Sequence, residues 1–112
     1  MAPRGAVGHG GAGGSGSTIV IGLLRVELRI PQAHSLKDKR RVVRSLLDRV
    51  SAKFNAAVAE TGHQDVWSYA EVAVVAVSND GRHVNSMLDT ILNFIESHAA
   101  AEVADAEIRF LG

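Results

Sequence analysis

Residues 19–30 have the pattern of a β-strand with one buried face. A set of apolar or small residues recurs at every second position: Gly22, Leu24, Val26, Leu28 and Ile30. Arg25, Glu27 and Arg29 occupy the intervening positions. This period of two predicts a strand that lies in a sheet with one face against a core. Pro31 ends the strand because proline has no N–H for the ladder.

Two stretches have the period of an amphipathic helix. Ser35 is a good N-cap for the first, and Asp38 three residues later forms a short capping box. Its predicted core stripe is Leu36, Val43, Leu47, Val50 and Phe54. Residues 78–80 cap the second helix. Its predicted stripe is Val84, Leu88, Ile91 and Ile95, with Met87, Leu92 and Phe94 at the margins.

The remaining apolar runs predict three more strands, at residues 55–60, 69–78 and 103–111. The order is then βαββαβ, and two helices with one apolar face each can cover only one side of a four-stranded antiparallel sheet. With right-handed crossovers the strand order is 4-1-3-2. The predicted class is α+β, with the ferredoxin-like split βαβ topology.

The composition divides the chain into a tail and one domain. Residues 1–18 hold seven glycines and no hydrophobic pattern, so we expect a disordered tail before a domain at residues 19–112. Cysteine is absent and no apolar run is long enough to span a membrane. These features favour a reducing, cytoplasmic location with no membrane partner, and no cofactor is predicted.

The basic and acidic residues are unevenly distributed. Residues 1–54 contain ten bases and three acids, whereas residues 55–112 contain two bases and nine acids. The folded domain could therefore present a basic surface, or the charges of the two halves could neutralise each other in contacts.

Five bases lie between His34 and Arg44, where the first predicted helix begins, and they are the candidate RNA- or anion-binding residues. They are Lys37, Lys39, Arg40, Arg41 and Arg44. Lys37, Arg41 and Arg44 share one solvent face near a helix N-terminus, which suits phosphate. The alternative is a solvated face in which Arg44 pairs with Asp48. Because aromatic residues are few, duplex-like RNA fits this face better than stacked single strands.

Arg40 is also expected to have a structural role. It lies one turn after Leu36, so its stem should be partly buried, with the guanidinium reaching Glu60 or Asp65. Arg41 should point to solvent.

Topology brings polar residues together at the two ends of the sheet. The cluster at the end where the first helix begins is His34, Ser35, His63, Gln64, Asp65 and Trp67. The cap of the second helix, at the opposite end, is Ser78, Asn79, Asp80, Arg82 and His83. A metal protein or small enzyme using His34, His63 and Asp65 is one alternative, but their spacing matches no ligand signature. We predict no metal site and no catalytic residue, with backbone capping as the role of this cluster.

Strand 69–78 is apolar on both faces. Val72, Val74 and Ala76 alternate with Ala73, Val75 and Val77. Antiparallel sheets with one wet face normally alternate more cleanly, so this pattern favours a homodimer that pairs through the open sheet face. Simple tolerance of small residues at the surface explains it equally well.

Four segments resemble the YlxP-like family of small bacterial proteins. They are Ala33-His34-Ser35-Leu36-Lys37-x-Lys39-Arg40-Arg41-Val42, His63-Gln64-Asp65-x-Trp67, Val77-Ser78-Asn79-Asp80-x-Arg82-His83-Val84 and Phe94-Ile95-Glu96-Ser97. The resemblance covers about residues 19–112. It implies a ferredoxin-like fold and a protein of uncharacterised function that accompanies the bacterial translation machinery, because such proteins are encoded beside an initiation factor and a ribosome-binding factor. It implies no catalytic residues.

Together, the basic helix and the resemblance predict a non-enzymatic accessory factor that associates with ribosomal or other structured RNA.

Overall fold

The computed structural model describes residues 18–111. Its elements are β1 (Val20–Arg29), α1 (Leu36–Lys53), β2 (Ala57–Gly62), β3 (Tyr69–Ser78), α2 (Gly81–His98) and β4 (Glu102–Phe110). The predicted order of elements is confirmed, although β2 begins and ends two residues later than expected. The expected disordered tail lies outside the described residues except for Thr18. None of the described helices is long and apolar enough to cross a membrane.

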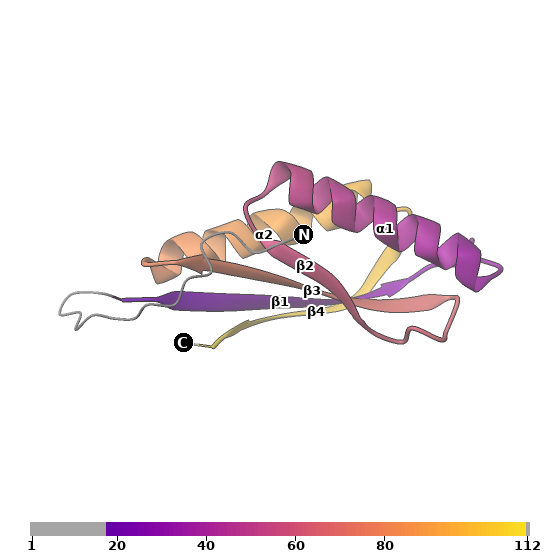
Figure 1. The fold of residues 1–112 in the computed structure, drawn as a ribbon, viewed down its shortest axis with the longest axis horizontal. Helices are drawn as coiled ribbons and strands as arrows, with labels where there is room; N and C mark the ends of the chain where they lie inside the picture. Colours follow the sequence, from indigo (N-terminus) through magenta and orange to yellow (C-terminus); the bar gives the residue numbers. More distant parts are fainter. Residues whose placement is uncertain (1–17, 112) are drawn as a thin grey trace.

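The four strands form one antiparallel sheet in the order β2-β3-β1-β4. This is the predicted order 4-1-3-2 read from the other edge, so β2 and β4 are the edge strands. Both helices lie on the same side of the sheet, and α1 runs above β2 and β3 (Figure 1). The predicted α+β, ferredoxin-like architecture is confirmed.

The core lies between the sheet and the two helices. All the even-numbered residues of β1 from 22 to 28 are buried, as are Val72, Val74 and Ala76 of β3. The predicted stripe of α2 is buried at all four positions. The period-two and period-3.6 patterns therefore identified the inner faces of β1 and α2 correctly, whereas β3, apolar on both faces, gave no such distinction.

The buried face of α1 differs from the predicted stripe. The structure buries Lys39, Val43, Leu46 and Val50. Leu46 takes the place expected for Leu47, which is only half-buried. The true stripe has spacings of four, three and four, and a lysine at its first position disguised it.

Side chains at the starts of both helices provide the predicted caps. The Ser35 hydroxyl accepts a hydrogen bond from the backbone N–H of Asp38 at 3.1 Å, and Asp38 accepts one from the backbone N–H of His34 at 3.0 Å. At α2 the cap is Asp80, which accepts from the Arg82 N–H at 2.9 Å. These bonds satisfy N–H groups that the helices themselves leave free.

Candidate functional site

A buried lysine joins the start of α1 to the connection between β2 and β3. Lys39 is 1% exposed, and its Nζ donates to the carbonyl oxygens of His63 and, at 2.8 Å, of Val66. The same Nζ lies 3.1 Å from Oε2 of Glu60 as an ion pair. That oxygen accepts no hydrogen bond within the described residues. Lys39 thus neutralises Glu60 and holds the loop in one conformation.

Two predictions about this helix are therefore wrong. Lys39 cannot contact an RNA phosphate, because its ammonium is enclosed by protein. Arg40 does not take the buried structural position, since it is exposed and the partner of Glu60 is Lys39. The physical reason is that the predicted stripe contained Val43 and Val50 correctly but took Leu47 in place of Leu46 and left out Lys39. Lys39, Val43 and Leu46 are four and then three residues apart, which is the spacing of one helix face. This spacing could have identified the buried lysine, but a lysine is rarely assigned to a core position.

The other predicted residues of this end are brought to the same place. The rings of His34 and Trp67 lie 6.2 Å apart, and the ring of His63 lies 5.0 Å from that of Tyr69. His63 has a left-handed backbone, and its carbonyl also accepts from the N–H of Val66 at 3.0 Å. These contacts form a tight turn with Trp67 half-exposed beside the start of α1. Ser35 caps the helix, and Gln64 and Asp65 are exposed in the turn.

The outer face of α1 carries exposed cations, which we call the basic surface: Lys37, Arg40, Arg41, Arg44 and Arg49. Together with Ser45 and Asp48 they line a shallow hollow along the helix. Within residues 18–111 none of the five forms an ion pair, and the alternative pair of Arg44 with Asp48 does not occur. Arg49 donates to the backbone carbonyl of His98 at 3.1 Å.

Most ion pairs to acids of the second half of the chain are formed by the arginines of β1. On the open face of the sheet, Arg25 donates to Glu27 at 2.7 Å and to Asp105 at 2.9 Å, with Glu107 at 3.2 Å and Glu71 at 3.4 Å. The pKa of the Glu107 carboxyl is lowered below its ordinary value, because this group accepts hydrogen bonds from Arg109, which has the larger effect, and from Arg25. The two alternatives for the uneven charge thus both occur: Arg25, Arg29 and the buried Lys39 pair with acids, whereas within the described part of the chain the five cations of the basic surface do not.

The Arg25 cluster gives a pH-dependent prediction. Arg25→Met leaves four carboxylates without their shared cation, so it should lower the free energy of unfolding at pH 7. A lowered carboxyl pKa stabilises the fold above the unfolded-state value and loses that effect as the pH falls through the folded value. The difference between the variant and the original chain should therefore shrink at about pH 3. Urea unfolding at both pH values measures this difference in the free energy of unfolding. The control is Arg29→Met, because within residues 18–111 Arg29 pairs only with exposed Glu102, at 3.4 Å. An equal difference for Arg25→Met at both pH values would contradict this prediction.

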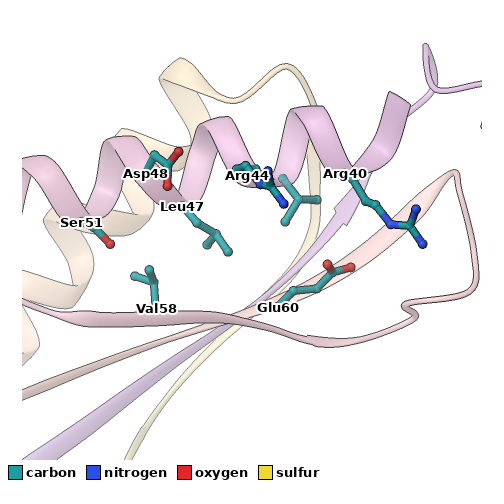
Figure 2. A pocket seen from close by; sticks show the side chains of 8 residues that line it. Arg40, Arg44, Leu47, Asp48, Ser51, Val58 and Glu60 are labelled. Carbon is teal, nitrogen blue, oxygen red and sulfur yellow. The ribbon is translucent and has the colours of Figure 1, made fainter. Parts of the chain in front are cut away.

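A groove separates α1 from the edge strand β2 (Figure 2). Its volume is about 310 Å³. Val43, Leu47 and Val58 supply apolar walls. Its polar lining residues are Arg40, Arg44, Asp48, Ser51 and Glu60. Sequence reasoning did not find this groove, because it depends on where α1 crosses the sheet.

The remaining predicted residues lie away from the basic surface. Ser78 ends β3, Asn79 and Asp80 lead into α2, and Arg82 and His83 lie in the first turn of that helix, at the opposite end of β3. The side chains of Ser78 and Asp80 accept hydrogen bonds there from the backbone N–H groups of Asp80 and Arg82. Within the described residues no three His, Asp or Glu side chains gather as metal ligands, so the alternative built on His34, His63 and Asp65 receives no support.

The open sheet face is apolar near the start of β1. Ile19 is 64% exposed and Val77 is 59% exposed, with Leu111 nearby on the continuation of β4. Pairing of two copies through this face stays a prediction.

Comparison with known proteins assigns the chain to a family. A model of the family described as "Protein of unknown function (DUF503)" matches residues 21–108. The chain belongs to this family. It is also similar to the "Uncharacterized protein YlxP" of Bacillus subtilis (strain 168), with 37% identity over 83 residues, which is 74% of this chain and 90% of that protein. The YlxP-like resemblance seen in the sequence is thereby confirmed.

A solved structure shares the fold of this DUF503 protein. The "De novo designed protein Foldit4" aligns with a TM-score of 0.50 and 17% identity, covering 84% of this chain and 97% of the designed one. At that identity the likeness shows the fold alone. The DUF503 match, residues 21–108, includes all of β1 but Val20, all of β2, β3 and both helices, and most of β4, and therefore the basic surface, Lys39 and the groove.

Proposed function

We propose that this DUF503 protein is a non-enzymatic, cytoplasmic accessory factor that binds structured RNA through the basic surface of α1. The observation that carries the proposal is the set of five exposed cations without an ion-pair partner in the described residues. An unpaired row of cations attracts phosphate, and release of the RNA's counterions supplies much of the affinity.

The arrangement favours recognition of phosphates over recognition of bases. The basic surface contains no aromatic side chain on which a base could stack. Lys37, Arg41 and Arg44 lie on one side of a straight helix, in the first half of its length. Cations spaced along a helix can follow the phosphates of one strand of an A-form duplex, whose deep major groove excludes side chains from the bases.

The N-terminal end of α1, beside the connection between β2 and β3, adds further contact groups to this surface. Trp67 and His34 lie there, beside the N-terminal turn of the helix. Partial positive charge at that terminus favours an anion, although Asp38 already offsets part of it. The family resemblance to proteins encoded beside translation factors supports ribosomal RNA as the class of target.

A charge reversal tests the proposal. Arg41→Glu should weaken the binding of a fluorescein-labelled RNA hairpin by about tenfold or more, because it removes one phosphate contact and adds a repulsive charge. The slope of log affinity against log salt should also become shallower by about one. Fluorescence anisotropy titrations at three salt concentrations measure both quantities.

The matched control is Arg82→Glu, which makes the same change at an exposed arginine in the first turn of α2, at the opposite end of the sheet. This variant should bind the hairpin like the original chain. Equal weakening by both substitutions would mean that only net charge matters, and absence of hairpin binding by the original chain would reject the proposed function.

A further inference from the structure

Strand β2 has one edge without a neighbouring strand. Its other edge pairs with β3 from Ala57 to Gly62, and the sheet ends there. No other backbone hydrogen bond of the described residues involves β2. An open edge of this kind offers a row of donors and acceptors to another chain.

The register identifies which backbone groups point outward. Leu111 donates to the carbonyl of Ile21, so the odd-numbered residues of β1 bond toward β4 and the even-numbered ones toward β3. The same alternation directs Ala57 and Ala59 toward β3. The N–H and C=O groups of Val58 and Glu60 therefore face the open edge.

The two edge strands of the sheet differ in how well they are protected against pairing with another chain. β4 carries a row of charged residues: Glu102, Asp105, Glu107 and Arg109. Such charges are the usual defence of an edge against unwanted pairing. In contrast, β2 begins with Ala57, Val58 and Ala59, and the charge of Glu60 is held by Lys39.

Helix α1 lies above this unprotected edge, and the groove opens between them (Figure 2). A strand added to β2 would have one face beneath α1. Side chains on that face would meet Val43 and Leu47 along the apolar wall, and the guanidinium groups of Arg40 and Arg44.

We propose that the open edge of β2 binds an extended segment of another protein as a fifth strand. The segment places an aliphatic side chain in the groove and an acidic side chain against Arg40 and Arg44. Backbone bonds to Val58 and Glu60 supply affinity, while the groove selects the alternate side chains. This inference does not depend on RNA binding.

Charge decides between an acidic partner and a second copy of the chain. Two β2 strands paired about a twofold axis would place two α1 helices side by side on the same face of the joined sheet. Each α1 has seven basic residues and only two acidic ones, so the helices would repel each other. A segment with acidic side chains would instead be attracted by the basic side chains of α1.

The experiment begins with a probe selected for this surface. Random linear twelve-residue peptides displayed on phage are panned against the full chain, and an enriched sequence is synthesised. We expect an aliphatic and an acidic residue two positions apart, because both side chains must lie on the face beneath α1. Binding of that peptide should slow hydrogen exchange of the Val58 and Glu60 N–H groups, measured by NMR, and should leave β4 unaffected.

Two variants at one position separate backbone pairing from side-chain contact. Val58→Ala removes the side chain alone, whereas Val58→Pro also removes the outward N–H and leaves the ladder to β3 intact. Val58→Pro should bind the peptide about tenfold more weakly than Val58→Ala. Arg41→Glu, which lies outside the groove, should retain peptide binding.

Several results would overturn the inference. They are the absence of any enriched peptide, equal affinity of the two Val58 variants, and exchange protection located on β4 instead of β2. Concentration-dependent dimerisation of the free chain that is lost in Val58→Pro, seen by sedimentation velocity, would replace the proposed partner by a second copy. If Val58→Pro does not fold, the exchange measurement on the original chain decides alone.

Discussion

Replacing Lys39 by methionine should lower the free energy of unfolding by about 3–5 kcal/mol, because one partner of a buried ion pair is removed. Methionine has a similar length, so most of the packing of the stem is preserved. What is lost is the charge that neutralises Glu60, 3.1 Å away, and the donor for the His63 and Val66 carbonyls. Those acceptors would remain turned toward an apolar side chain.

Arg40→Met is the matched control, one position along the same helix. Arg40 is exposed and has no ion pair in the described residues, so the change should stay within about 0.5 kcal/mol. Urea unfolding followed by circular dichroism measures both variants. Adding Glu60→Gln to Lys39→Met should recover part of the loss, since it removes the unpaired charge. Equal midpoints for the Lys39 and Arg40 variants would contradict the burial of Lys39.

Gly22→Ala should lower the free energy of unfolding by about 1–3 kcal/mol through overpacking. A methyl group at this position of β1 would lie 2.5 Å from Cγ1 of Val84 and 2.9 Å from Cδ1 of Leu88. Both side chains are fully buried in α2, and the valine has no flexible end that could move aside. The glycine therefore permits the close approach of α2 to the sheet.

Gly81→Ala provides the control for this substitution. An added methyl group there would meet only Val20 Cγ1, at an ordinary 3.9 Å, in the first turn of α2. Alanine should be neutral or stabilising at this position, because it restricts the unfolded chain and favours the helix. Thermal unfolding compares the two. In a Val84→Ala background the penalty of Gly22→Ala should become smaller, and an unchanged penalty would show that the contact is not its cause.

Local patterns in the sequence determined most of the architecture of this DUF503 protein. The alternation in β1 and the stripe of α2 placed each residue of their predicted buried sets on the observed inner face, because a single buried face imposes one period on the side chains. The caps at Ser35 and Asp80 were also found, since they depend on residues two or three positions away. Right-handed crossovers then allowed the strand order to be derived.

Only the tertiary structure decided the role of Lys39 and the form of the candidate sites. A lysine becomes a core residue when acceptors from a distant segment surround it, here the carbonyls of His63 and Val66 with Glu60. No local pattern contains those partners, so the predicted stripe of α1 left out Lys39 and took Leu47 in place of Leu46. The groove beside β2 arises for the same reason. Its walls belong to a helix and a strand whose separation is determined by the packing of the whole domain.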